Sequence, residues 1–172
     1  MSVPPPAPAA ASTAFIGLGG NIGDVANTLR AAVVVIDALP STRVLRVSRL
    51  YATPAWGRVD QPDFVNAAAA VATALAPRTL LDALLEIEQR FGRDRDRDHD
   101  RWGPRTLDLD LLMHGDRVVD EPGLRLPHPH LGGRAFVLVP LAEIAPALVV
   151  PGQGTVDALL AAVARDGIKA LP

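Results

Sequence analysis

The stretch Thr-Ala-Phe-Ile-Gly-Leu-Gly-Gly-Asn-Ile-Gly-Asp, residues 13–24, begins as a short apolar run and ends in a glycine-rich turn. Residues 13–18 are typical of a buried strand, and the glycines that follow predict a tight turn. Asp24 is a suitable N-cap for a helix over residues 25–39, where apolar side chains recur at helical spacing until Pro40. The stretch therefore predicts a strand that leads directly into a helix.

The rest of the chain extends this unit. Further strands are predicted over residues 42–47, 50–52 (as its continuation or partner), 65–73 and 107–113, and helices over 77–91, 137–144 and 156–164. The order strand, helix, strand, strand, helix, strand predicts an α+β fold. We expect a ferredoxin-like sandwich, with a mainly antiparallel sheet and two helices packed on one of its faces.

Composition limits the class of protein. The chain has 172 residues, 49% of them hydrophobic, which suits a single domain over residues 13–172. Residues 1–12 are mostly Pro, Ala and Ser and are expected to form a flexible tail without the features of a signal peptide. The lack of Cys and of any long apolar run favours a cytoplasmic protein with no membrane partner. A net charge of −2 argues against nucleic acid as a partner, and we expect a monomer.

Two aspartates provide the first indication of chemistry. In Leu107-Asp108-Leu109-Asp110-Leu111, residues two apart on a strand point to the same face. Asp108 and Asp110 would then lie side by side, with the leucines packed behind them. A shared Mg²⁺ would relieve their repulsion, because this ion prefers oxygen ligands and phosphates. The alternative is a solvent-exposed strand that carries Asp twice.

Arginines surround this pair in the sequence. Six of them fall between Arg90 and Arg105, whereas the chain has one lysine, Lys169. The guanidinium group suits bidentate recognition of phosphate oxygens. Carboxylates for a metal and neighbouring arginines together indicate a polyphosphate site. The Arg-Asp repeat of residues 93–98 could equally be a solvated loop whose charges pair with one another.

Other motifs are less specific. The turn after the first strand lacks the third glycine of a dinucleotide fingerprint, because Ile22 takes its place, and no Walker lysine follows it. A tight turn is therefore favoured over direct phosphate contact. His128 and His130 are too few for a zinc site. We expect His128 to hydrogen-bond a phosphate, while His130 fits a surface loop equally well.

An acceptor pocket could be built from Thr53, Phe64, Asn66 and Phe136, which lie near predicted strand ends and loops. Two rings that flank a flat heterocycle, with an amide that offers both a donor and an acceptor, suit a pterin or a purine. Each ring could instead belong to the core.

Several of these segments resemble one family. The sequences at residues 15–24, 51–54, 60–68, 126–129, 134–136 and 140–146, and above all Arg-Trp-Gly-Pro-Arg-Thr-Leu-Asp-Leu-Asp at 101–110, are similar to 6-hydroxymethyl-7,8-dihydropterin pyrophosphokinases of folate biosynthesis. The resemblance spans about residues 13–160. Departures include Gly20 in place of a common serine, Phe64 in place of a common tyrosine, and an arginine loop about two residues longer than in one familiar form.

The resemblance implies a reaction in which ATP donates its terminal diphosphate to the hydroxymethyl group of a reduced pterin and AMP is released. It implies two Mg²⁺ ions on Asp108 and Asp110. It further implies three sets of residues: Arg93, Arg95, Arg101 and Arg105 in catalysis along the phosphates; Leu85, Glu88, Trp102, His128 and Arg134 at ATP; and Thr53, Pro54, Ala55, Phe64, Asn66 and Phe136 at the pterin. The equivalence of Arg95 as against Arg97 stays open.

Two other functions are compatible with parts of the pattern. A two-metal nuclease could use the aspartate pair and the basic loop, although the net charge and the scarcity of lysine argue against it. A nucleotide-sensing module without catalysis could share the fold, since fold does not fix function.

Overall fold

The computed structural model describes residues 10–55, 60–94 and 103–172. The elements in chain order are β1 Ser12–Gly20, α1 Val25–Asp37, β2 Thr42–Val47, β3 Tyr51–Thr53, β4 Phe64–Thr73, α2 Pro77–Arg90, β5 Asp108–His114, β6 Val119–Glu121, β7 Leu124–Leu126, the 3-10 turn η1 Leu131–Gly133, α3 Ala135–Ile144, β8 Val149–Val150, β9 Gly154–Thr155, α4 Val156–Ala161 and β10 Lys169–Ala170. Among the described residues, no helix is long and apolar enough to cross a membrane.

The main sheet has the strand order β10-β3-β4-β1-β5, and β2 also pairs with β4. Every pairing in this sheet is antiparallel. The predicted α+β sandwich with an antiparallel sheet is confirmed, and β4 and β1 form its centre. The predicted strand 42–47 has the observed bounds, and the second helix begins at Pro77 as expected.

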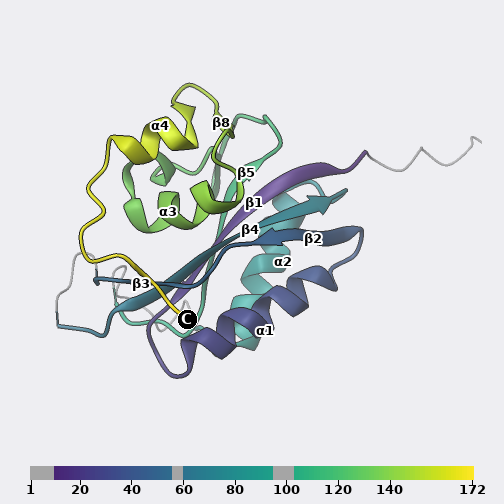
Figure 1. The fold of residues 1–172 in the computed structure, drawn as a ribbon. Coiled ribbons are helices and arrows are strands. Elements are labelled where there is room, and N and C mark those ends of the chain that lie inside the picture. The colour runs from purple at the N-terminus through teal and green to yellow at the C-terminus, as the bar shows by residue number, and fades with distance from the viewer. Residues whose placement is uncertain (1–9, 56–59, 95–102) are drawn as a thin grey trace, which may run out of the picture.

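Helices cover both faces of the sheet, which makes three layers (Figure 1). The helices α1 and α2 pack on one face, and α3 and α4 pack on the other. The sequence predicted the first two helices on one face but gave no position for α3 and α4. Because both faces are buried, β4 consists largely of alanine: Ala67 and Ala69 face α1 and α2, whereas Ala68 and Ala70 face α3.

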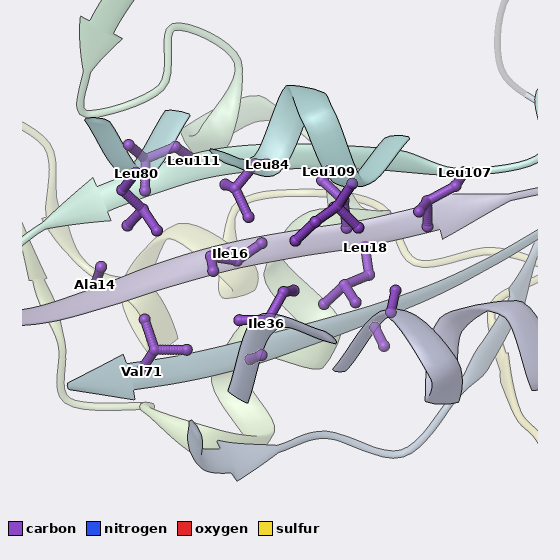
Figure 2. Packing of buried hydrophobic residues seen from close by; sticks show 14 of the residues in the cluster. Ala14, Ile16, Leu18, Ile36, Val71, Leu80, Leu84, Leu107, Leu109 and Leu111 are labelled. Atoms are coloured by element: carbon purple, nitrogen blue, oxygen red, sulfur yellow. The ribbon is translucent and has the colours of Figure 1, made fainter. Parts of the chain in front are cut away.

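Strand β1 carries larger side chains toward α1 and α2 than toward α3. Ala14, Ile16 and Leu18 lie in the core between the sheet and these two helices, where Figure 2 shows them beside Leu109 and Leu111 of β5. On the opposite face, Phe15 packs near α3, but the next positions are Gly17 and Gly19. Part of the sheet on the α3 side is therefore left without side chains.

The first strand is longer than predicted at both ends. It begins at Ser12, which pairs with Thr73, and it continues through Gly19 and Gly20, which pair with Asn66 and Val65. The expected turn therefore starts only at Asn21. The sequence missed the short strands β6 to β10, because two or three residues are too few to show an alternating pattern.

Candidate active site

Strand register brings the two aspartates together. Asp108 of β5 lies opposite Gly19 of β1, and Asp110 lies opposite Gly17. Both carboxylates therefore stand on the α3 face of the sheet, next to the two positions where β1 has no side chain. Leu109, between them, points into the core on the other face and is 1% exposed. The predicted arrangement of two carboxylates in front of a leucine layer is confirmed.

The bare part of the sheet forms the floor of a cavity, which we call the acceptor cavity. Its wall includes both aspartates and most of the residues expected at the pterin. The lining residues are Gly17, Leu18, Gly19, Thr53, Pro54, Phe64, Asn66, Ala67, Arg105, Asp108, Asp110, Arg134, Phe136 and Val137. The predicted Ala55 lies instead in an adjoining cavity behind Phe136, which it lines with Thr53, Pro54 and Arg134.

A second, larger cavity lies between α2 and the β6–β7 hairpin, and we call it the hairpin cavity. Leu85 and His128, two of the residues expected at ATP, line it, and so does Asp110. Asp110 is thus a wall of both cavities. A molecule in one cavity can therefore meet a molecule in the other at this carboxylate.

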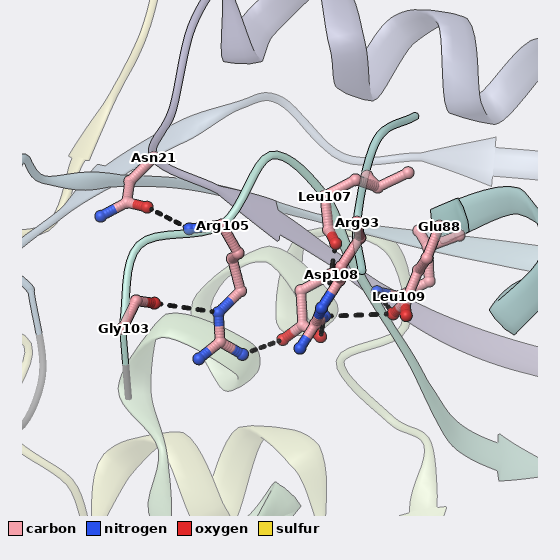
Figure 3. Close-up of polar contacts among 8 residues, drawn as sticks. All are labelled: Asn21, Glu88, Arg93, Gly103, Arg105, Leu107, Asp108 and Leu109. Atoms are coloured by element: carbon pink, nitrogen blue, oxygen red, sulfur yellow. Dashed lines mark hydrogen bonds and ion pairs between the residues drawn. The ribbon is translucent and has the colours of Figure 1, made fainter. Parts of the chain in front are cut away.

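Asp108 is held by two arginines, as Figure 3 shows. Arg93 donates from Nη1 to Asp108 Oδ1, to the Leu107 carbonyl at 3.3 Å and to Glu88 Oε1 at 3.3 Å. Arg105 donates from Nη1 to Asp108 Oδ2 at 3.2 Å and from Nε to the Gly103 carbonyl at 3.3 Å. Asp108 therefore has a fixed orientation at the edge of the acceptor cavity.

Glu88, on α2, supports the hydrogen bonds around Asp108 from the face of the sheet that α1 and α2 cover. Its side chain is 1% exposed, and Oε1 accepts a hydrogen bond of 2.8 Å from the backbone N–H of Leu109. The same oxygen accepts from Arg93, whose side chain is 9% exposed. Glu88 thus ties α2 to β5 beside the aspartates. Its expected contact with ATP stays a prediction, as does the expected role of Arg93 along the phosphates.

Asp110 carries a carboxyl group whose charge is poorly accommodated. Burial, and then the negative charges of Asp108 and Glu88, raise its pKa to about 7, while Arg134 and Arg105 act in the opposite direction. A divalent cation between the carboxylates would favour the charged form. Among the described residues no group of three or more His, Asp or Glu side chains could hold a metal alone. Two carboxylates and open space nevertheless fit Mg²⁺, which commonly takes its remaining oxygen ligands from phosphates and water.

His128 presents a hydrogen-bond donor to the hairpin cavity. Its Nδ1 accepts the backbone N–H of His130 at 3.2 Å, so in the neutral ring the proton is on Nε2. Burial first, and then the charge of Arg134, lowers the pKa of His128 to about 4. At neutral pH the ring is therefore an uncharged donor.

The depressed pKa gives a testable result. In a pH titration followed by two-dimensional NMR of the imidazole nitrogens, His128 should stay neutral down to about pH 5, with its resonance assigned from a His128→Gln variant. Since the unfolded chain binds this proton near pH 6.5, the free energy of unfolding should decrease as pH falls from 6.5 toward 4. A midpoint between pH 6 and 7 would contradict the buried, neutral ring.

The remaining predicted residues are distributed as follows. Arg134 lines the acceptor cavity, with its guanidinium carbon 5.6 Å from the centre of the Phe136 ring. Arg95, Arg101 and Trp102 lie outside the described residues. No pattern in the sequence predicted that the β6–β7 hairpin lines a cavity, and the role of Gly17 and Gly19 in the floor of the acceptor cavity was also missed. Their spacing of two residues on a strand was the available signal, because it removes side chains from one face only.

The chain is similar in sequence to proteins of one family. The model of the 7,8-dihydro-6-hydroxymethylpterin-pyrophosphokinase family matches residues 15–146. A 2-amino-4-hydroxy-6-hydroxymethyldihydropteridine pyrophosphokinase of Pseudomonas aeruginosa is 48% identical over 158 residues, which cover 92% of this chain and 96% of that protein. A relative of the same name from Methylorubrum extorquens is 49% identical over 156 residues, covering 91% and 96% of the two chains.

Solved structures show the same fold. The crystal structure of wild-type Plasmodium falciparum HPPK-DHPS superposes with a TM-score of 0.68 at 14% identity, covering 88% of this chain and 41% of that one. At this identity the likeness concerns the fold alone. Family membership rests on the sequence matches: the chain belongs to the 7,8-dihydro-6-hydroxymethylpterin-pyrophosphokinase family.

Proposed function

We propose that the acceptor cavity binds 6-hydroxymethyl-7,8-dihydropterin and the hairpin cavity binds ATP, so that the two substrates meet at Asp110. The family carries out pyrophosphokinase chemistry in folate biosynthesis, with ATP as co-substrate. The observation that carries the proposal is that Asp110 is a wall of both cavities and stands on the same face as Asp108. A diphosphate that moves from one cavity to the other at this shared wall would pass Asp110.

The bond changes are those of a direct transfer. The hydroxymethyl oxygen of the pterin forms a bond to the β-phosphorus of ATP. The bond from that phosphorus to the oxygen bridging the α- and β-phosphates breaks, and AMP leaves with this oxygen. The hydroxyl proton is released, and no described residue is assigned as the base. Such a transfer depends on positioning and on charge neutralisation.

Asp108 and Asp110 are the residues that would hold magnesium, and we propose two ions. Magnesium, when bound, would offset phosphate charge and favour loss of the hydroxyl proton. Arg93 and Arg105 keep Asp108 in place, and the Nε2 proton of His128 is available to a phosphate oxygen. By resemblance to the family, Arg95, Arg101, Arg134 and Trp102 complete the phosphate and nucleotide contacts.

In the acceptor cavity, polar and aromatic groups have separate tasks. Asn66 donates from Nδ2 to Thr53 Oγ1 at 2.7 Å, so the Thr53 hydroxyl proton is directed to another acceptor, for which the pterin is the candidate. Phe64 and Phe136 would stack on the faces of the ring. Pro54 and Ala55 continue the loop that follows Thr53.

The stacking role predicts a specific binding defect. Phe136→Leu keeps apolar contact but removes the ring, and we expect the dissociation constant of the pterin to rise about tenfold, since stacking on one aromatic ring contributes on the order of 1–3 kcal/mol. Phe136→Tyr should bind within about threefold of the parent. Isothermal titration calorimetry with 6-hydroxymethylpterin measures both. Equal pterin affinity in the Leu and Tyr variants would contradict stacking of the Phe136 ring on the pterin.

The activity itself is tested by following AMP. Formation of AMP should require Mg²⁺, ATP and the hydroxymethyl pterin together, and pterin lacking the hydroxyl should give none. AMP formed without the acceptor would indicate a hydrolase. Cleavage of DNA or RNA with Mg²⁺ would favour a nuclease. Nucleotide binding without turnover would favour a sensing module.

The monomeric state and the cytoplasmic location stay predictions from the sequence. Sedimentation velocity at micromolar concentration measures the first.

A further inference from the structure

We infer that Asn21 is a positioning residue that joins the acceptor side of the active site to the phosphate side and couples the binding of the two substrates. This inference rests on the proposed function. Asn21 lies in the turn between β1 and α1, is 5% exposed, and lines neither of the two cavities.

The hydrogen bonds of Asn21 reach segments far away in the sequence. Its Nδ2 donates to Gln61 Oε1 at 3.0 Å and to the Pro62 carbonyl at 3.0 Å. Its Oδ1 accepts from the backbone N–H of Arg105 at 2.9 Å, and its own backbone N–H donates to the Arg105 carbonyl at 2.9 Å. Figure 3 shows the bond from Arg105 to the Asn21 amide. Both amide hydrogens and the amide oxygen are therefore in use.

On the phosphate side, these bonds fix the backbone from which the Arg105 guanidinium reaches Asp108. The contact is close: a Cβ atom added at Gly20 would lie 2.6 Å from the Thr106 carbonyl oxygen, so the chain at residues 105–106 lies directly on this turn. Movement of Asn21 would displace Arg105, and with it one of the two arginines on Asp108.

On the acceptor side, Pro62 is two residues before Phe64, which begins β4 and lines the acceptor cavity. The bonds from Asn21 therefore set the point from which β4 enters the site. One buried side chain thus holds both the start of β4 and the backbone of Arg105, whose guanidinium orients a carboxylate that is proposed to hold magnesium.

Local structure does not account for this side chain. The N-cap of α1 is Asp24, whose side chain accepts from the Asn27 N–H. A turn between strand and helix needs no bond to residues 61, 62 or 105. An amide suits this position, because its nitrogen donates twice, to Gln61 and Pro62, while its oxygen accepts from the Arg105 N–H. A hydroxyl has one donor hydrogen, and an apolar side chain has none.

Coupling follows from this shared residue. If one substrate orders its own segment, Asn21 is ordered with it, and the second substrate has a smaller entropic cost to meet. Removal of the shared bonds should leave each site present but less dependent on the other. This differs from a purely structural defect, which would weaken both affinities without changing their ratio.

The test is a binding cycle on the full-length protein. The dissociation constant of 6-hydroxymethylpterin is measured by calorimetry with Mg²⁺, in the presence and absence of a saturating ATP analogue that has a methylene group between the α- and β-phosphates. The ratio of the two constants is the coupling factor. We expect Asn21→Ala to lower this factor at least fivefold, within the range of typical coupling energies.

Asn21→Asp separates the contribution of the bonds to residues 61–62 from that of the bond to Arg105. It keeps the acceptor for the Arg105 N–H and loses the donor to residues 61–62, so it should lose coupling while kcat falls less than in Asn21→Ala. Asn27→Ala is the matched control, because this exposed asparagine hydrogen-bonds Asp24 and Arg30 at the start of α1 and lies outside the contacts of Asn21. It should keep the parent's coupling factor. Circular dichroism and thermal melting establish that each variant is folded.

A coupling factor of one in the parent, or a factor unchanged within twofold in folded Asn21→Ala or Asn21→Asp, would overturn the inference. If Asn21→Ala does not fold, Asn21→Asp alone decides. Failure of the parent to bind both ligands would instead contradict the proposed function, so the two failures are distinguishable.

Discussion

Asp110→Asn is expected to lower kcat by at least about 10³-fold, on the order of 4 kcal/mol of transition-state stabilisation. The substitution keeps the size of the side chain and removes the charge at the point where the acceptor and hairpin cavities meet. Asp108→Asn should cause a loss of the same order. Asp110→Asn is the cleaner variant, because Asp108 also holds Arg93 and Arg105. Steady-state formation of AMP measures the effect.

The thermal stability of Asp110→Asn should not fall with its activity. Because burial and two neighbouring carboxylates oppose the charge of Asp110, its neutral replacement should melt at the same temperature as the parent or higher. Asp116→Asn, on the exposed turn after β5, is the matched control and should retain both activity and stability. Near-normal turnover in Asp110→Asn would exclude the metal role of this residue.

Arg105→Ala should lower kcat by about 10²-fold, corresponding to roughly 2.7 kcal/mol, as for loss of one preorganised group at a developing charge. The guanidinium bonds Asp108 and the Gly103 carbonyl at once, and it lines the acceptor cavity. Arg105→Lys keeps the charge but not this fork of donors, so it should lose about tenfold. Rapid-quench measurement of a single turnover reports the chemical step directly.

Binding separates this role from a general loss of structure. The dissociation constant of the pterin should change less than about threefold in Arg105→Ala, because the aromatic and amide contacts of the cavity remain. Arg43→Ala, on the exposed side of β2, controls for the removal of an arginine. If Arg105→Ala keeps the parent's single-turnover rate, Arg105 does not act on the phosphates during transfer.

The elements of the sandwich could be predicted because the sequence carries their periodicity. Alternation in residues 107–111 gave the face of each aspartate, and the leucines behind them are buried as that alternation requires. The alanines of β4 were predicted to form a strand, but their meaning was missed. Small side chains on both faces of β4 indicate that helices pack on both faces of the sheet. A helix layer opposite α1 and α2 could therefore have been inferred from these alanines.

Contacts between distant segments could not be predicted from one sequence. Nothing local to Glu88 indicates that its carboxylate accepts from the backbone of Leu109, twenty-one residues away. The same is true of Asn21, which a sequence pattern assigns to a turn. Its partners at residues 61, 62 and 105 are set by strand register and by the path of loops, which depend on the complete fold.

The central claim, that neighbouring carboxylates of β5 hold metal between an acceptor cavity and a nucleotide cavity, is most directly tested by anomalous diffraction from a ternary crystal. The crystal would contain Mn²⁺, the methylene analogue of ATP and 6-hydroxymethylpterin. We predict manganese peaks bound by Asp108 and Asp110, with the triphosphate toward His128 and the pterin over Gly17 and Gly19. Manganese bound elsewhere, or a pterin outside that glycine floor, would contradict the claim.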